Sequence, residues 1–504
     1  MSEPQIRIRK LNHATIQIHS EMDIAMELSE AFKFMVDGAK FSPAYKTGLW
    51  DGWIRLFNLG SRTMSSGLYT KVIEFAETRG YSYVIDPSED DTITPPGYQT
   101  PGVTYESIKT YMESLNLHAH GEKLVIREYQ IMGVLVSIRD RQAILVSSVG
   151  SGKSMMLYCA IRFITEELGL RVLLMVPTIG LTSQMRADFK DYSTHNGYDV
   201  DKNLHIITGG VEKVTDKPVV VSTFQSLKGL LAPYFNSYGA IITDEGHKIA
   251  AKSFQDIYGK ATKVPFRLTC TGTMHDAKCN QLTMIGLTGP VNNIALTKDL
   301  IEAKQLVPLN IKSISLNYPP ELCKLAKKMT YEEEINWIIT HPKRNNFIKN
   351  LAVSCKGTTL VFFRFIDQGK DIFDRIKEAV GDTRNVFLIY GDVDKEDRET
   401  IRIAAGTDDP ILVVSYGTMS AGVNMPAVEN MIIAHPVKSK ITFLQSIGRG
   451  LRLKAGKSLC NLFDIGDNLA TKSKVNATYS HFGIRLQLLT AEGYQFRIVN
   501  VPFG

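Results

Sequence analysis

The N-terminal part of the chain combines two hydrophobic periods. Apolar and polar residues alternate over residues 5–9 and again over 15–18, a pattern typical of half-buried strands. Between Ile24 and Met35, large apolar residues recur about once per helical turn, which predicts a helix. Residues 92–104 then contain too much proline and glycine for regular structure and are expected to form a linker.

Beyond the linker, short unbroken apolar runs alternate with helical patterns, in two series separated near Lys304. Strands buried on both faces imply a parallel sheet with helices on each side. The predicted strands are 143–146, 172–176, 219–221, 240–242 and 267–269 in the first series, and 359–363, 386–390, 411–415, 431–434 and 459–463 in the second.

The expected fold class is therefore α/β, with two tandem parallel-sheet domains behind a small α+β domain. The expected divisions are an N-terminal domain over 1–100, a first α/β domain over 105–303, a second over 304–475, and a C-terminal extension over 476–504.

Composition narrows the classes of protein. A hydrophobic content of 44% with 22% charged residues is ordinary for a globular chain. There is no signal-peptide pattern at the start and no uninterrupted apolar stretch of the roughly 18 residues that a membrane span needs, so we expect a cytosolic protein. Six scattered cysteines without metal-ligand spacing predict reduced, buried thiols. The net charge of +6 is compatible with a polyanionic partner but does not establish one.

A glycine-rich loop, residues 147–154, follows the predicted strand 143–146 and precedes a helical pattern. This context lets backbone N–H groups and the positive helix end converge on phosphates. Lys153 is expected to reach the β- and γ-phosphates and Ser154 to bind Mg²⁺, although Ser147 stands where the strict pattern has glycine. The alternative is a glycine-rich turn that binds nothing. The residues expected to surround the nucleotide phosphates are Val149, Gly150, Ser151, Gly152, Lys153 and Ser154.

An acidic pair follows the strand 240–242, at a strand end where open α/β sheets bind ligands. Phosphoryl transfer needs a metal and a positioned water, and we assign Asp244 to Mg²⁺ and Glu245 to the water. His247 is expected to be a coupling residue rather than a ligand. The alternative is an acidic loop that caps a strand.

In the second α/β domain, Gln445 precedes two arginines, Arg449 and Arg452, that are three residues apart and so share one helix face. An arginine at the γ-phosphate stabilises transition-state charge, and supplying it from a second domain makes hydrolysis depend on closure. A solvated basic helix is the alternative.

Together these motifs resemble the superfamily 2 helicases of the DExH kind, which implies two RecA-like motor domains, ATP and Mg²⁺. The resemblance extends to Arg127 and Gln130 as adenine-reading residues, to Thr271 and Thr273 as coupling residues, and to Gly422 and Asn424 beside the nucleotide. Residues implied to contact the DNA strand are Pro177, Thr178, Gln184, Thr223, Gln225, Arg364 and Ser420.

Within that superfamily the chain is similar to the UvsW-type helicases of large tailed phages. The likeness includes residues 45–56, 331–335, 343–345 and 435–440. It implies a motor that remodels forks, displacement loops and Holliday junctions in recombination and repair, acting in the host cytoplasm if the chain is phage-encoded. No protein partner is implied.

The N-terminal domain is the natural reader of DNA structure, yet residues 1–100 carry 10 Lys/Arg against 13 Asp/Glu, a net charge of −3. Basic residues gather between Lys40 and Arg62, and we expect Lys46, Trp50 and Arg55 to contact DNA. The alternative is that the tryptophans are core residues and the charges a solvated surface.

The leading expectation is an ATP-dependent DNA helicase or branch-migration motor that binds single-stranded, duplex and branched DNA. An RNA helicase, a double-stranded DNA translocase subunit without strand separation, and a nucleotide-gated clamp remain as alternatives.

Overall fold

The computed structural model describes residues 3–36, 38–90, 92–119, 121–248, 251–274, 278–391, 404, 407–420, 428–451 and 457–504. The chain divides into two compact units. The first consists of residues 1–147 and 152–295, and the second of residues 296–504 together with the loop 148–151.

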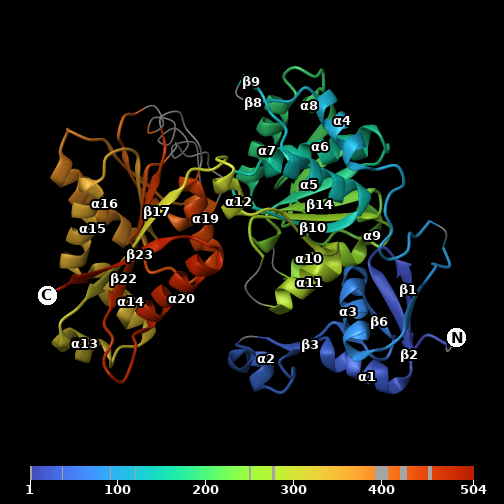
Figure 1. Ribbon diagram of the computed structural model, residues 1–504, viewed down its shortest axis with the longest axis horizontal. Coiled ribbons are helices and arrows are strands. Elements are labelled where there is room, and N and C mark those ends of the chain that lie inside the picture. Colours follow the sequence, from blue (N-terminus) through green and yellow to red (C-terminus); the bar gives the residue numbers. More distant parts are fainter. Residues whose placement is uncertain are drawn as a thin grey trace. The chain divides into compact units, whose positions relative to one another are not determined.

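The N-terminal domain is built on a five-stranded sheet of order β5-β6-β2-β1-β7. Helices α1 and α3 pack their apolar residues against this sheet (Figure 1). Its elements are β1 Ile6–Asn12, β2 Thr15–Ser20, α1 Met22–Ala31, β5 Phe57–Asn58, β6 Thr63–Ser65, η2 Ser66–Leu68, α3 Tyr69–Arg79 and β7 Tyr83–Asp86.

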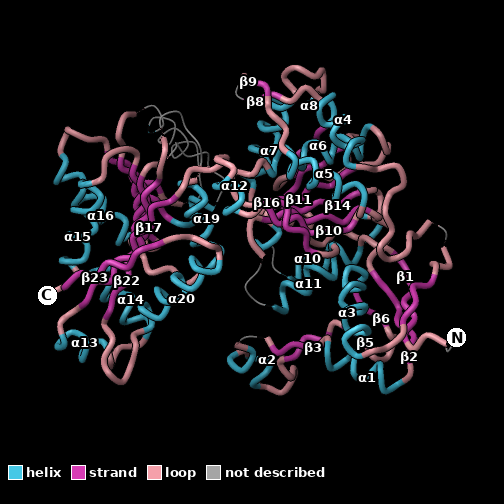
Figure 2. The backbone as a smooth tube through the Cα atoms, viewed as in Figure 1, coloured by secondary structure: helices cyan, strands magenta, loops and turns pink. Residues whose placement is uncertain are grey.

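The first helix was predicted to continue to Met35, and this part of the prediction is wrong. Helix α1 stops at Ala31, and Lys33–Met35 form strand β3, antiparallel to β4 Trp53–Arg55. Pairing with a distant strand overrides the local period here, while Phe32 still packs into the core. Strands β3 and β4 form a separate two-stranded sheet beside η1 Ala39–Phe41 and α2 Pro43–Lys46 (Figure 2).

No helix or strand occurs between Asp86 and Tyr105 among the residues that the structure describes there. The proline- and glycine-rich segment therefore has the irregular structure expected of it. After it come α4 Tyr105–Ser114 and the short strands β8 His118–Ala119 and β9 Glu122–Lys123.

The first α/β domain, called the first motor domain after the role expected of it, is a seven-stranded sheet of order β12-β13-β11-β14-β15-β10-β16, and all its strand pairs are parallel. Its strands are β10 Gln142–Ser147, β11 Val172–Val176, β12 Leu204–Ile207, β13 Val219–Thr223, β14 Ala240–Asp244, β15 Phe266–Thr271 and β16 Val291–Ala295. Its helices are α5 Glu128–Arg139, α6 Lys153–Glu166, α7 Ile179–Tyr192, α8 Val200–Asn203, α9 Ala232–Phe235, α10 Ala251–Lys260 and α11 Lys278–Thr288.

Successive side chains along these strands lie on opposite faces of the sheet and pack into two different hydrophobic clusters. In β10, Ala143 and Leu145 belong to the cluster with α5 and α6, whereas Ile144 and Val146 belong to the cluster with α10 and α11. Both faces of the sheet are therefore covered, which explains why its strands read as unbroken apolar runs.

The N-terminal domain shares the second of these clusters, so the two domains have one continuous core. The approach of η2 to α11 is close enough to require glycine. A Cβ on Gly67 would lie 2.0 Å from the carbonyl oxygen of Ile285, and one on Gly286 would lie 2.9 Å from Cβ of Ser65.

The second motor domain is also a seven-stranded parallel sheet, of order β19-β20-β18-β21-β22-β17-β23. Its strands are β17 Leu309–Asn317, β18 Thr359–Phe363, β19 Val386–Ile389, β20 Ile411–Ser415, β21 Asn430–Ile433, β22 Cys460–Asn468 and β23 Phe496–Pro502. Its helices are α12 Thr297–Glu302, α13 Pro320–Ala326, α14 Tyr331–Thr340, α15 Pro342–Ser354, α16 Ile366–Val380, α18 Tyr416–Ser420, α19 Lys440–Gly450 and α20 Ala477–Ala491.

The segment expected to be a C-terminal extension instead supplies an edge of this sheet. Strand β23 pairs with β17 in parallel, and helix α20 packs on β22, where a Cβ on Gly466 would lie 2.4 Å from the Phe482 ring.

The five cysteines that the structure describes in full are buried and free, as expected: Cys159, Cys270, Cys323, Cys355 and Cys460. Within the described ranges, none of the helices has both the length and the apolar character needed to cross a bilayer.

Candidate nucleotide and nucleic-acid sites

The glycine-rich loop lies between β10 and α6, as predicted. Gly150 and Gly152 have φ of 84° and 85°, the left-handed region in which glycine is unstrained. Ser147 is fully buried at the end of β10, and its carbonyl accepts a 2.9 Å hydrogen bond from Nζ of Lys153. The small residue that replaces glycine at this position therefore fits a packed strand end. Ser154 lies within hydrogen-bonding reach of the Tyr192 hydroxyl.

Gln130 lies directly against this loop. Its side chain is 5% exposed, and a Cβ on Gly152 would come within 2.6 Å of its Nε2. Its Oε1 accepts the backbone N–H of Arg127 at 3.0 Å, and Arg127 donates to the Tyr129 hydroxyl. The residues predicted to read adenine and to bind phosphate thus meet at one place.

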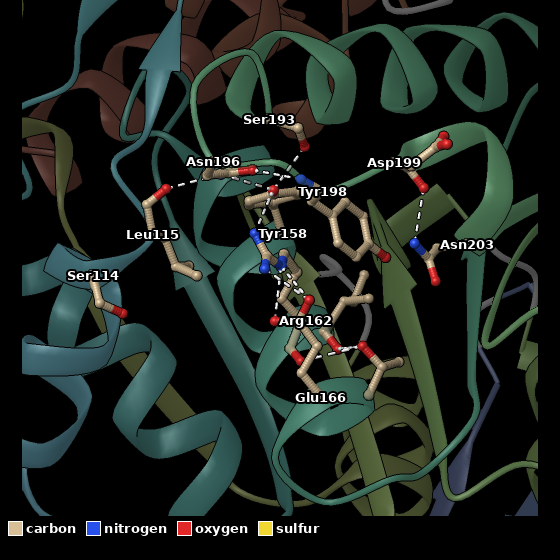
Figure 3. A network of polar contacts seen from close by, with 12 residues as sticks. Ser114, Leu115, Tyr158, Arg162, Glu166, Ser193, Asn196, Tyr198, Asp199 and Asn203 are labelled. Atoms are coloured by element: carbon tan, nitrogen blue, oxygen red, sulfur yellow. Dashed lines mark hydrogen bonds and ion pairs between the residues drawn. The ribbon is translucent and has the colours of Figure 1, made fainter.

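Helix α6, which starts at Lys153, is anchored at its other end by a buried arginine (Figure 3). Arg162 donates to both carboxylate oxygens of Glu166 and, at 3.1 Å, to the Tyr158 hydroxyl. Its guanidinium lies 4.4 Å from the centre of the Tyr198 ring. These contacts fix the helix whose first turn presents Lys153 and Ser154.

The predicted acidic pair lies at the end of strand β14, at the same carboxyl edge of the sheet as the glycine-rich loop. Strand β15 lies between β14 and β10. Asp244 is 7% exposed, and burial together with Glu245 raises its pKa, while the nearby cations Lys153 and Lys248 oppose that rise. Glu245 has a φ of 50°, unusual for a residue with a side chain. Strain of this kind costs about 1–3 kcal/mol and occurs preferentially at functional sites.

The predicted coupling residues contact one another. Nδ1 of His247 lies 2.6 Å from Oγ1 of Thr271, which in turn donates to the carbonyl of Thr273 at 2.8 Å. Oε2 of Glu245 is 3.4 Å from the same His247 nitrogen. The acid expected to position water is thereby connected to the loop after β15.

The motifs expected to contact the DNA strand follow β11 and β13, whose ends are paired at Val176 and Thr223. Thr178 caps α7 by accepting the N–H of Leu181, and Oγ1 of Thr223 contacts Ser226 at 3.0 Å. Pro177 is buried, Gln184 half-buried and Gln225 exposed. These residues follow the same carboxyl edge of the sheet as the glycine-rich loop, but over β11 and β13, which β14 and β15 separate from β10.

The second motor domain is described only in part at its predicted site. Gln445 is half-buried on α19, and Arg364 is exposed after β18. Arg449 is on α19, but its side chain and that of Ser420 lie outside the described residues, as do Gly422, Asn424 and Arg452 entirely.

In the N-terminal domain, Lys46 is exposed, and Arg55 forms an ion pair of 2.5 Å with Asp51. Trp50 is half-buried and donates through Nε1 to the Trp53 carbonyl at 3.0 Å. Sequence reasoning did not single out Phe41 and Leu49, which are 81% and 85% exposed. Nothing in the sequence distinguishes two such apolar residues from core residues.

Among the described residues, no group of three or more His, Cys, Asp or Glu side chains forms a metal site by itself.

Comparison with known proteins places these features in a family. Residues 5–86 match the family described as DNA helicase UvsW, N-terminal, residues 111–276 the Type III restriction enzyme res subunit, and residues 342–454 the helicase conserved C-terminal domain. Two RecA-like sheets with these motifs define the class: the chain is a superfamily 2 helicase, an enzyme that uses ATP.

The relatives make the assignment narrower. The ATP-dependent DNA helicase UvsW of Enterobacteria phage T4 is 30% identical over 496 residues, covering 97% of this chain and 95% of that protein. Its crystal structure aligns over 99% of this chain and 100% of that one, with 27% identity and a TM-score of 0.52. The DNA 3'-5' translocase XPB2 of Sulfurisphaera tokodaii is 22% identical, and the alignment covers 69% of this chain and 83% of that protein. The chain belongs to the UvsW family of DNA helicases.

Proposed function

We propose that this chain is an ATP-dependent motor that unwinds or branch-migrates forks, displacement loops and Holliday junctions in recombination and repair. The observation that supports the motor chemistry best is the carboxyl edge of the first sheet. There Lys153 lies within electrostatic reach of the Asp244–Glu245 pair, and Glu245 reaches the His247–Thr271–Thr273 chain.

The proposed nucleotide site uses these groups in separate roles. Gln130, with Arg127, reads adenine; Lys153 and the backbone of residues 149–154 hold the phosphates. Ser154 and Asp244 hold Mg²⁺, which neutralises phosphate charge when it is bound. Deprotonation of Asp244 is favoured once a cation is present, because the cation offsets the burial that raises its pKa.

Glu245 is proposed to orient and deprotonate the attacking water. Gln445, Arg449 and Arg452 are proposed to complete the site from the second motor domain, so that hydrolysis requires both domains. The His247–Thr271–Thr273 chain would then report the state of the nucleotide to the loop after β15.

The DNA strand is proposed to follow Pro177, Thr178, Gln184, Thr223 and Gln225 in the first motor domain, and Arg364 and Ser420 in the second. Hydroxyls and backbone N–H groups bind phosphates without reading bases, so binding should be independent of sequence. Lys46, Trp50 and Arg55 are proposed to meet the branched or duplex part. The proposed place of action is the cytoplasm of an infected host.

The test is the rate of ATP hydrolysis with single-stranded DNA, duplex, a four-way junction or RNA as separate effectors. The proposal expects the junction to stimulate hydrolysis and to be dissociated into its arms, whereas stimulation by RNA alone would overturn it. Glu245→Gln, which keeps size and hydrogen-bonding capacity, should bind ATP and DNA but lose turnover. Parental turnover in that variant would refute the role given to Glu245.

A further inference from the structure

A cavity of about 140 Å³ lies in the first unit, where the N-terminal domain, the segment 94–99 and the first motor domain meet. Each of the three contributes to its wall. Lys10 and Tyr69 come from the N-terminal domain, Gly97 from the segment, and Arg141 and Asn292 from the motor domain.

The most unusual residue in the cavity wall is a buried lysine, Lys10. It is on β1, its side chain is 4% exposed, and no carboxylate pairs with it in the described part of the chain. Burial, together with the nearby cations Arg267 and Arg141, lowers the pKa of Lys10 to about 7.

The charged groups around the cavity do not compensate the positive charge of Lys10. All three donating nitrogens of Arg267 bond to backbone carbonyls, at 2.7–2.8 Å, and Arg141 donates to Thr100 and lies over the Tyr98 ring. The one carboxylate in the cavity wall, Asp140, is already bound by two nitrogens of Arg139. Nearby His13 is buried with an unpartnered Nδ1, and burial and the same cations lower its pKa to about 3.

A buried ammonium among other cations is costly unless it loses its proton or gains an anion. The cavity leaves room for an anion beside Lys10. Its volume corresponds to a few water molecules at about 30 Å³ each, and is well below the roughly 300–1,000 Å³ of sites for drug-sized ligands. The volume therefore suits a compact oxyanion better than a drug-sized ligand.

We propose that this cavity binds a phosphate-type oxyanion, held by Lys10 and Arg141 between the N-terminal domain and the first motor domain. Asn292 and the Tyr69 hydroxyl offer further donors. Two sources share this chemistry: inorganic phosphate, which ATP hydrolysis releases, and the terminal phosphate of a DNA strand. In either case the anion would hold β1 against the start of β10.

Calorimetric titration with sulfate tests the site, because sulfate does not itself titrate near neutral pH. All proteins carry Lys153→Ala, which removes the main phosphate-loop ligand. Sulfate should bind saturably to this parent and to the matched surface variant Lys71→Met, and at least ~10-fold more weakly to Lys10→Met, the cost of losing one charged hydrogen bond. Equal binding by Lys10→Met would overturn the proposal.

Two further measurements guard against a variant that fails to fold. Arg141→Gln should weaken sulfate binding in the same way, and equal affinity would count against the site. In the Lys153→Ala parent, sulfate affinity should fall as pH rises from 6 to 8, because Lys10 loses its proton there while the anion favours the charged form. The charged and titratable groups around Lys10 are Arg141, Arg267 and His13, with Asp140 in the cavity wall and Asp90 acting on His13.

Competition identifies the source. Displacement of sulfate by inorganic phosphate alone indicates free phosphate as the ligand. Displacement by a 5'-phosphorylated oligonucleotide, and not by its 5'-hydroxyl counterpart, indicates a DNA end. If neither competes, the site is not a phosphate site and the proposal fails, while ATPase and unwinding assays of the protein with Lys153 intact continue to test the proposed function independently.

Discussion

The two motor domains have the same fold and different chemistry. Numbered within each domain, the strands lie in the same order in both sheets: third, fourth, second, fifth, sixth, first and seventh. In the first domain, the first strand leads into a loop with two left-handed glycines. In the second, β17 leads into Tyr318, Pro319 and Pro320, and the two prolines have a fixed φ and no backbone N–H to donate to a phosphate. We therefore expect nucleotide binding to depend on the loop, while the shared fold only provides its position.

The two domains also use buried carboxylates differently. In the second domain, Asp467 bonds to Arg344 at 2.7 Å, both with side chains 0% exposed, and Asp464 bonds to Arg485. In the described part of the first domain, no arginine pairs with the buried Asp244. Removing one partner of a buried ion pair leaves an uncompensated charge and destabilises the fold, whereas a buried acid without an arginine partner can serve a ligand instead.

The largest expected effect tests this contrast with two isosteric substitutions. Asp467→Asn strands a buried guanidinium and should cost about 3–5 kcal/mol of unfolding free energy. Asp244→Asn should leave stability unchanged or raise it, because a carboxylate whose folded pKa is raised costs stability increasingly as pH rises above its unfolded value. Urea unfolding at pH 8 without nucleotide measures both, and equal losses would remove the distinction.

The next effect concerns the lysines near the first strand of each sheet. Lys153→Ala should lower ATP turnover by ~10²-fold or more, comparable to loss of one preorganised donor to developing charge. The control, Lys312→Ala on β17, removes a lysine that lies over the Phe463 ring and should keep turnover near the parental rate. A large loss in the control would mean that the second sheet carries nucleotide chemistry as well.

A smaller effect separates hydrolysis from movement. His247→Ala removes the hydrogen bond to Thr271, worth about 1 kcal/mol, or roughly fivefold. Strand separation per ATP hydrolysed should fall by about that factor while hydrolysis persists. Parallel assays of phosphate release and unwinding decide this, and an equal fall in both would place His247 in the chemistry instead.

The smallest effect is expected in the N-terminal domain. Lys46→Ala combined with Arg55→Ala should weaken junction binding modestly and reduce the salt dependence of log K by up to ~0.9 for each DNA phosphate that is no longer neutralised. Arg55 already pairs with Asp51, so most of the loss should come from Lys46. Binding titrations over a range of salt, with Lys71→Ala as control, measure the slope; an unchanged slope favours the purely structural interpretation of this region.

Much of both sheets could be predicted because their strands are buried on both faces. All ten strands proposed from apolar runs are present. The four strands that were missed have polar or partly exposed positions: β12, β16 and β23 are edge strands, and β17 contains Lys312, Ser313 and Ser315 although it lies inside the sheet. Their pairing is decided by partners far away in the chain, which local patterns do not encode.

The candidate site followed the same rule. The glycine-rich loop and the acidic pair are each contiguous in sequence, so their positions after β10 and β14 could be predicted, whereas their roles stay predictions. The contact of Gln130 with Gly152, and the cations around Lys10, join segments that are distant in sequence and became visible only in three dimensions.

Strand β23 has a consequence for synthesis of the protein. Its partner β17 lies near the start of the second motor domain, and nearly the whole sequence of that domain separates the two strands. The sheet therefore cannot complete this last strand pair until Pro502 has left the ribosome. The first sheet gains its corresponding strand, β16, at Ala295. Domains form in order as the chain emerges, so the half that we propose to bind nucleotide can fold while the second sheet is still incomplete.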